Sequence, residues 1–339
     1  MMRVMTPRRY RGQGTPYFWG ILLACACMIV TLCAWRLHAV APPADAPWLY
    51  NEVWAVARDR LLSAVIIGAA LGTAGVLLRT ATSNPLADPH VTGVNSGAAF
   101  GAVAASFVGG SYNGALLLPA ALIGASVAAF LVISLSLRGG STDLSGAMSI
   151  QKMVLLGIAV SAVFSALTSI VLVLDEAQLT TVLAWLNGRL GGVRLPDIVP
   201  VIIAFTLLFP AVLAYGRVFD VLATGESMSR SVGVDPARVR KSAVIAAVVL
   251  VSACVAAAGP IGFLGLLSAT FAYRLCGPRH RRAFALASVI GALALLGADS
   301  IGQALWAPAE TPVGILTGIA GIPLLLWGIR QPTAQGKRG

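Results

Sequence analysis

The stretch SNPLADPHVTG, residues 83–93, stands between two strongly apolar segments of the chain. Pro85 and Pro89 disfavour the α-helical conformation for the residues before them, which are Asn84 and Asp88. Asn and Asp side chains also form hydrogen bonds with nearby backbone groups, which stabilises turns. We therefore predict a rigid corner that ends one apolar helix and begins the next.

The segments on both sides of this corner belong to a chain that is apolar along most of its length. Of its 339 residues, 58% are hydrophobic and 11% are charged, and the mean hydropathy is +0.85. Uncharged apolar runs of about 20 residues recur, which is the length that a helix needs to cross a bilayer. A charge at the bilayer centre costs about 2.5–3.5 kcal/mol, and these runs contain almost none. The composition therefore predicts an all-α polytopic membrane protein.

The apolar runs predict one transmembrane domain over residues 18–330, with about ten helices. Residues 1–17 form a basic N-terminal tail, and residues 331–339 form a C-terminal tail. Only Gly259-Pro260 separates the seventh predicted span from the eighth. The predicted spans cover residues 18–35, 61–78, 91–108, 114–137, 153–174, 198–215, 239–258, 261–275, 284–305 and 312–329.

The positions of the basic residues predict the orientation of these spans. With ten spans both termini lie on one side, and 19 of the 24 Lys and Arg residues fall on that side. Because positively charged loops stay in the cytoplasm, we expect both termini there. The formal net charge of +11 then follows from topology and from attraction to anionic membrane lipid, not from nucleic-acid binding. The basic residues on the predicted outer side are Arg36, Arg58, Arg60, Arg189 and Arg194.

The longest hydrophilic internal segment, residues 216–241, lies on the predicted cytoplasmic side. Gly225 and Gly233 bracket a stretch that suits a helix of one or two turns. Asp235 followed by Pro236 is a typical helix start, with Asp as the N-cap and Pro at the first helical position. These local signals favour a structured docking surface for a partner. A solvated loop with ordinary positive-inside charge is the alternative.

The sequence lacks the motifs of several enzyme classes. It has no GxxxxGK[ST] phosphate loop, so we do not expect this chain to hydrolyse ATP, and it has no Ser/His/Asp or HExxH arrangement. The three histidines are isolated and are expected to be solvated loop residues, and the five cysteines lack metal-site spacing. Asp299 is the best candidate for a carboxylate within a span, and we expect it to hydrogen bond to a neighbouring helix end. We predict no enzyme, cofactor or metal site, and an energy source in a partner protein.

Six motifs occur in order between residues 60 and 330: NPLADP, LLGIAVSAVFSALTSIVLVL, LAWLNGRLGG, LATGESMSRSVGV, GPIGFLGL and TPVGILTGIAGIPLLLW. Together they resemble the iron-chelate and cobalamin permease family of ABC importers. The resemblance implies the type II ABC importer permease fold in a bacterial cytoplasmic membrane, with ten helices in each of two permease subunits. It also implies two ATPase subunits, which bind ATP-Mg, and an extracytoplasmic substrate-binding protein that delivers ferric siderophores, haem or cobalamin.

The resemblance assigns two regions to contacts with partners. The loop at residues 216–238 corresponds to the coupling helix that engages the ATPase. Arg58 and Arg60 correspond to residues that dock the binding protein, although Ala57 and Asp59 depart from the family's R-x-P-R pattern. The implied coupling residues are Leu222, Gly225, Glu226, Ser227, Arg230 and Gly233.

The resemblance also implies pathway and structural residues. Hydroxyl side chains in the fifth and tenth spans are pathway candidates, and a hydrogen bond back to their own helix is their alternative role. The corner at residues 84–89 is expected to fix helix geometry beside the ATPase, with a turn of no role in coupling as the alternative. The pathway candidates are Ser161, Ser165, Thr168 and Thr317, and the structural residues are Asn84, Pro85, Asp88, Pro89, Gly259 and Pro260.

The sequence thus predicts the transmembrane permease subunit of an ABC importer for a ferric siderophore. A haem or cobalamin importer is the nearest alternative, followed by an ion-coupled secondary transporter and a regulatory membrane subunit. Because the chain lacks several family-typical residues, we expect it to pair with a different permease subunit in a heterodimer. A homodimer is the alternative.

Overall fold

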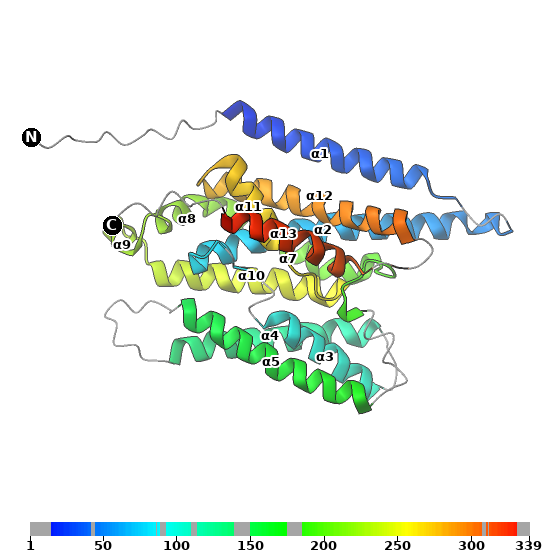
Figure 1. The fold of residues 1–339 in the computed structure, drawn as a ribbon, viewed down its shortest axis with the longest axis horizontal. Helices are drawn as coiled ribbons and strands as arrows, with labels where there is room; N and C mark the ends of the chain where they lie inside the picture. Colours follow the sequence, from blue (N-terminus) through cyan, green and yellow to red (C-terminus); the bar gives the residue numbers. More distant parts are fainter. Residues whose placement is uncertain are drawn as a thin grey trace, which may run out of the picture.

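The computed structural model describes residues 15–41, 45–85, 87–88, 93–109, 114–138, 150–174, 185–306, 310 and 312–330. Over these residues the chain is helical and contains no β-strand. Most of the long helices run side by side along one direction (Figure 1). The elements are α1 Thr15–His38, η1 Pro47–Leu49, α2 Tyr50–Thr82, α3 Val94–Gly109, α4 Gly114–Arg138, α5 Ile150–Leu174, α7 Leu195–Ala214, α8 Gly216–Leu222, α9 Glu226–Ser231, α10 Pro236–Ala258, α11 Leu264–Cys276, α12 His280–Trp306 and α13 Val313–Arg330.

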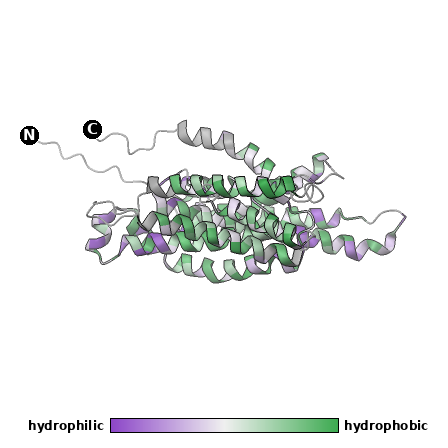
Figure 2. Ribbon diagram, turned by 90° about the horizontal axis from the view of Figure 1, so that it is seen from below, coloured by the Kyte–Doolittle hydropathy of each residue, from purple (hydrophilic) through white to green (hydrophobic). Residues whose placement is uncertain are grey.

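Each predicted span overlaps one helix, and the all-helical class is confirmed for the described residues. Figure 2 shows hydrophobic residues along the bundle and hydrophilic residues gathered toward its two ends. The helices α3 and α11 are apolar but shorter, so the number of membrane crossings stays a prediction. Among the described residues, six stretches are long and apolar enough to cross a membrane: Tyr17–His38, Pro47–Thr82, Leu155–Leu174, Leu195–Ala214, Pro236–Ala258 and His280–Trp306.

The predicted start of the second span, at residue 61, is too late for the helix that contains it. α2 begins at Tyr50, with Glu52 in its first turn. A carboxylate near a helix N-terminus is favourable, and the sequence from Tyr50 to Arg60 contains neither Gly nor Pro. The helix therefore continues beyond its apolar part, a length that hydropathy alone does not reveal.

The central helix of the bundle is α2, which contacts α10, α11 and α12. Its glycines lie directly against the backbones of these neighbours. A Cβ atom at Gly68 or Gly72 would collide with a backbone carbonyl of α12, and one at Gly75 would collide with the carbonyl of Gly265 in α11. Close backbone approach through small residues is how helices pack in lipid, where the hydrophobic effect does not bring them together. These contacts define the core of the fold.

Two further parts of the bundle flank this core. The helices α3, α4 and α5 pack against one another, and α3 and α4 also contact α10 (Figure 1). Gly97 of α3 and Gly124 of α4 meet backbone to backbone. On the opposite side, α1 contacts α12 and α2, and most of its surface is exposed (Figure 1). The core is therefore covered unequally on its two sides.

The corner between α2 and α3 ends α2 as predicted. Ser83 follows the last helical residue and has a left-handed φ of 49°. The backbone N–H of Ala87 donates to the carbonyl oxygen of Asn84 at 3.2 Å, and Asp88 is buried. Pro89 lies outside the described residues. A role for this corner beside an ATPase stays a prediction.

Candidate functional site

The predicted coupling segment forms two short helices, α8 and α9, at one end of the bundle (Figure 1). Gly225 and Gly233 bracket α9 with φ angles of 112° and 82°. Residues with a side chain rarely adopt these angles, so the two glycines allow the sharp turns on either side of the helix. The predicted helix of one or two turns is confirmed.

The start of the next helix, α10, is also confirmed. The Asp235 side chain accepts hydrogen bonds from the backbone N–H groups of Ala237 and Arg238, at 3.0 and 3.4 Å. Pro236 occupies the first helical position. The cap gives α10 a defined first turn directly after α9.

Two side chains hold α9 against the bundle. Arg240 of α10 donates from Nη1 to Glu226 Oε1 at 2.6 Å, and the Arg240 side chain is only 12% exposed. Ser229 is fully buried, and its Oγ lies 3.1 Å from the carbonyl oxygen of Val221 in α8, an acceptor outside α9. The predicted coupling residue Leu222, the last residue of α8, is also buried. These contacts fix the orientation of α9.

The opposite face of α9 is exposed and partly apolar. Met228 is 57% exposed and Val232, just after the helix, is 58% exposed. Ser227 and Arg230 lie on the same exposed surface. A short helix with apolar residues and a cation suits a groove on a partner protein, and Met adapts well to such grooves. Binding of an ATPase subunit by this face stays a prediction.

The predicted docking residues Arg58 and Arg60 lie near the start of α2. Their two side chains have different surroundings. Arg60 forms an ion pair with Asp299 of α12 at 2.8 Å; the two side chains are 13% and 0% exposed. Arg58 is 41% exposed, and it donates to its neighbour Asp59. Asp299 was expected to contact a helix end, and its partner is instead the Arg60 guanidinium. Docking of a binding protein by these arginines stays a prediction. Of the two side chains, Arg58 is the more accessible to a partner.

The carboxylate that does hold a helix end is Asp59, which the sequence analysis treated only as a departure from a family pattern. Its Oδ2 accepts a hydrogen bond from the backbone N–H of Leu195, the first residue of α7, at 3.1 Å. Its side chain is almost fully buried. Asp59 therefore joins α2 to the start of α7.

The four pathway candidates occupy two kinds of environment. Thr168 and Thr317 are buried, and they donate to the carbonyl oxygens of Phe164 at 2.8 Å and Gly314 at 3.0 Å within their own helices. Ser161 is half-buried, and Ser165 is exposed on α5. The hydroxyls of the two threonines thus form hydrogen bonds within their own helices, which was the alternative role predicted for them. A pathway role for the four residues stays a prediction.

The break at Gly259-Pro260 receives the loop that precedes α7. Gly259 ends α10 with a φ of 75°, and a Cβ atom there would collide with the carbonyl oxygen of Trp185. The backbone N–H of Arg189 donates to the carbonyl oxygen of Ala258 at 2.9 Å. The break therefore accommodates the loop, and a backbone hydrogen bond joins the loop to the end of α10.

Comparison with known proteins identifies the family. The model of the FecCD transport family matches residues 17–331. The chain belongs to the FecCD transport family. The permease FecD of the Fe(3+) dicitrate system of Escherichia coli is 34% identical over 269 residues, covering 79% of this chain and 81% of the relative. A solved metal-chelate type ABC transporter in an inward-facing conformation superposes with a TM-score of 0.81 and 26% identity, covering 93% of this chain and all of that one.

Other relatives in the FecCD family carry different names. The iron-uptake system permease FeuC of Bacillus subtilis is 33% identical, over 79% of this chain and 80% of the relative. The vitamin B12 import system permease BtuC of Klebsiella pneumoniae is 31% identical over 93% of each chain. The family thus includes both iron and cobalamin importers.

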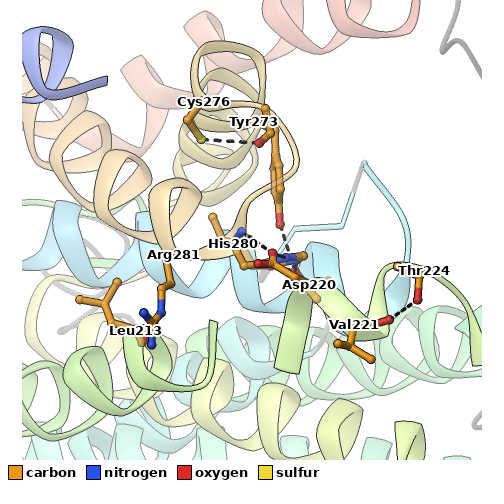
Figure 3. Close-up of polar contacts among 11 residues, drawn as sticks. Leu213, Asp220, Val221, Thr224, Tyr273, Cys276, His280 and Arg281 are labelled. Carbon is orange, nitrogen blue, oxygen red and sulfur yellow. Dashed lines mark hydrogen bonds and ion pairs between the residues drawn. The ribbon is translucent and has the colours of Figure 1, made fainter. Parts of the chain in front are cut away.

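Sequence reasoning missed the residues that position α8 in this FecCD permease. The expectation that the histidines are solvated is wrong for His280, which begins α12 and is 3% exposed. It contacts Asp220 of α8 (Figure 3). The two residues are 60 positions apart and share no motif, so only the packed helices bring them together. In the described part of the chain, no group of three His, Cys, Asp or Glu side chains is placed to hold a metal ion.

Proposed function

We propose that this chain is the permease subunit of a bacterial ABC importer that moves a ferric siderophore across the cytoplasmic membrane. Its family is that of the permease subunits of metal-chelate and siderophore-type ABC importers. The observation that carries the proposal is α9, a short helix fixed to the bundle on one face and exposed on the other. Such a helix supports docking of an ATPase subunit.

In the proposed mechanism this chain moves and makes no covalent bond. A binding protein docks at the end of the bundle that carries Arg58. Two partner ATPase subunits close when they bind ATP-Mg, and they displace α9 with Met228 and Val232 in the ATPase groove. Glu226 and Ser229 carry that displacement into the bundle, and two permease subunits rock relative to each other. The substrate passes between them.

The proposed substrate is a ferric siderophore because most of the named relatives serve iron. They include permeases of iron-uptake, iron dicitrate and iron hydroxamate systems. Cobalamin is the second candidate because the vitamin B12 permease matches over the largest share of both chains among these relatives. Haem is retained as a third substrate for the test.

Uptake in cells with and without the gene tests the proposal. Radiolabelled ferric hydroxamate, ferric citrate, haem and cobalamin are supplied separately, and each strain is complemented with the intact gene or a variant. Glu226 is the first residue of α9, where Pro is tolerated, so a helix-breaking Pro belongs at Ser229. The Ser229 backbone N–H donates to the carbonyl oxygen of Gly225 at 3.0 Å, a bond that Ser229→Pro removes.

We expect deletion to abolish uptake of one iron chelate, and the intact gene to restore it while Ser229→Pro does not. Ser242→Ala is the control, because this exposed hydroxyl contacts only its own helix. If deletion abolished only cobalamin uptake or only haem uptake, that compound would replace the ferric siderophore as the proposed substrate. Unchanged uptake of all four compounds in the deletion strain would contradict the proposed function.

A further inference from the structure

The inner face of α8 carries a polar contact to another helix. Asp220 Oδ1 accepts a hydrogen bond from the backbone N–H of His280 at 2.8 Å and lies 2.8 Å from His280 Nδ1 (Figure 3). A carboxylate oxygen only accepts, so Nδ1 carries a proton and donates it to the bond. One oxygen atom of α8 therefore receives two hydrogen bonds from the first residue of α12.

The same histidine reaches the central helix. His280 Nε2 lies 3.0 Å from Thr80 Oγ1 in the last turns of α2, and Thr80 Oγ1 lies 3.2 Å from the hydroxyl of Tyr273 in α11. The Thr80 hydroxyl has one proton, which it donates either to the carbonyl oxygen of Val76, 2.8 Å away, or to Nε2 of a neutral imidazole. A charged imidazole donates from Nε2 to Thr80 Oγ1, and the Thr80 proton then stays with Val76. Three helices, α8, α12 and α2, meet at one imidazole ring.

The His280 ring is packed among aromatic side chains. Its centroid is 5.9 Å from that of Phe219, 6.2 Å from that of Phe284 and 5.7 Å from that of Tyr273. The His280 side chain is 4% exposed, whereas the Asp220 side chain is 40% exposed. Loss of a partner leaves the buried imidazole nitrogen unsatisfied, because water reaches the carboxylate but not the ring.

A groove of about 390 Å³ lies between α7, α8 and α10, and Tyr215 and Phe219 are among the residues that line it. On the side of α12, Phe219 packs against Phe284, with ring centroids 5.6 Å apart. Arg281 of α12 donates to the carbonyl oxygens of Leu213 and Ala214, just before α8, at 2.9 and 3.2 Å. The bonds of Asp220 add a polar contact from a side chain of α8 itself.

We propose that Asp220, His280 and Thr80, together the α8 anchor, are positioning residues that carry displacement of the coupling segment into α2 and α12. The inference rests on the proposed function, in which an ATPase moves α9. The Glu226–Arg240 ion pair connects α9 to α10. The α8 anchor supplies a second connection, which leads directly to the two helices whose glycines meet in the core.

The geometry distinguishes two substitutions of the same residue. Both bonds from His280 end on Asp220 Oδ1, so the amide oxygen of Asp220→Asn can accept both and only the charge is lost. Asp220→Leu keeps the branch at Cγ, is larger, and accepts neither bond. Thr80→Val keeps the shape of the side chain and removes the contacts of its hydroxyl with His280 Nε2, with the Tyr273 hydroxyl and with the carbonyl oxygen of Val76. The α8 anchor predicts that Asp220→Asn couples normally, whereas Asp220→Leu and Thr80→Val do not.

The test uses the whole complex, purified with its ATPase subunits and placed in proteoliposomes with the binding protein. Radiolabelled ferric hydroxamate, ferric citrate and cobalamin are the transport probes, and the readouts are basal ATP hydrolysis, substrate moved per ATP, and Tm. For Asp220→Leu we expect basal hydrolysis to remain and substrate moved per ATP to fall about tenfold, as the loss of hydrogen bonds to a charged group implies. Asp197→Leu is the matched control, because Asp197 also accepts a backbone N–H at a helix start, at the other end of the bundle.

Each outcome has a defined meaning. Wild-type substrate per ATP in Asp220→Leu would overturn the α8 anchor, and so would an equal loss in Asp220→Asn. If Asp220→Leu fails to assemble, Thr80→Val decides: a loss of substrate per ATP at unchanged Tm supports the anchor, and full coupling overturns it. A wild-type complex that holds no ATPase, or moves none of the three probes, would instead contradict the proposed function.

Discussion

The residues Arg60 and Asp299 form the most deeply buried ion pair among the described residues, and they make a sharp prediction about stability. Arg60→Met leaves the Asp299 carboxylate buried without its partner, a change that costs about 3–5 kcal/mol. We expect a clear fall in the Tm of the detergent-purified protein. The double variant Arg60→Met/Asp299→Leu removes both charges and should recover most of the loss.

Arg58→Met is the control for that series. Arg58 is 41% exposed, and exposed ion pairs contribute at most about 1 kcal/mol. An equal fall in Tm for Arg58→Met and Arg60→Met would show that burial of the Arg60 pair is not what matters.

Single glycines allow a second prediction at this scale. Gly72→Ala places a Cβ atom against the carbonyl oxygen of Ala287, so we expect weaker packing of α2 on α12 and a lower Tm. Gly297→Ala is the matched control, because nothing lies within 4 Å of the added atom and Ala favours a helix by about 0.5–1 kcal/mol. A Tm that falls equally in both variants would contradict the close backbone contact.

At the scale of single elements, α9 is the helix whose role is easiest to test. Met228→Asp places a charge on its exposed apolar face without touching the buried contacts of Glu226 or Ser229. We expect the permease to insert and keep its Tm, and the ATPase subunits to be lost during affinity purification. Val56→Asp is the control, since Val56 is also exposed but lies near the other end of α2. Retention of the ATPase subunits by Met228→Asp would remove α9 from the contact.

Some features of these elements could be predicted from local signals in the sequence, and others could not. The bracketing glycines of α9, the Asp235 cap and the end of α2 at the corner depend on signals within a few residues, and the sequence predicted them. The early start of α2 was missed because the first turns are polar while hydropathy reports only the apolar part. The contacts of Asp59 with Leu195 and of Asp220 with His280 join distant positions, and no local pattern specifies them.

The whole molecule exposes apolar surface that a single chain does not cover. On α5, Ile158, Val163 and Ile170 are all more than half exposed. Part of this surface faces lipid, and we expect another part to pack against a second permease subunit. The predicted heterodimer is tested by co-expressing tagged and untagged copies of this chain with its neighbouring genes. We expect the tagged copy to retain a different FecCD-family permease and no untagged copy of itself.

Recovery of the untagged copy in place of a second permease would establish the homodimer. A chain recovered alone, with neither partner, would contradict both arrangements.

The fold class and the family follow from the sequence because hydropathy and ordered motifs extend over the whole chain. Subunit pairing does not follow, since it depends on a surface that only the assembled bundle presents.

The ion pair between Arg60 and Asp299 also bears on how the cell makes this protein. The two residues are 239 positions apart, so a ribosome adding about 5–20 residues per second takes roughly ten to fifty seconds to supply the second after the first. Throughout that interval the guanidinium has no acidic partner from α12. Its long side chain can reach the lipid headgroups at the membrane boundary and wait there. Nascent chains that stop before α12 would therefore keep an arginine near the start of α2 without the Asp299 carboxylate, and only a completed chain neutralises it within the bundle.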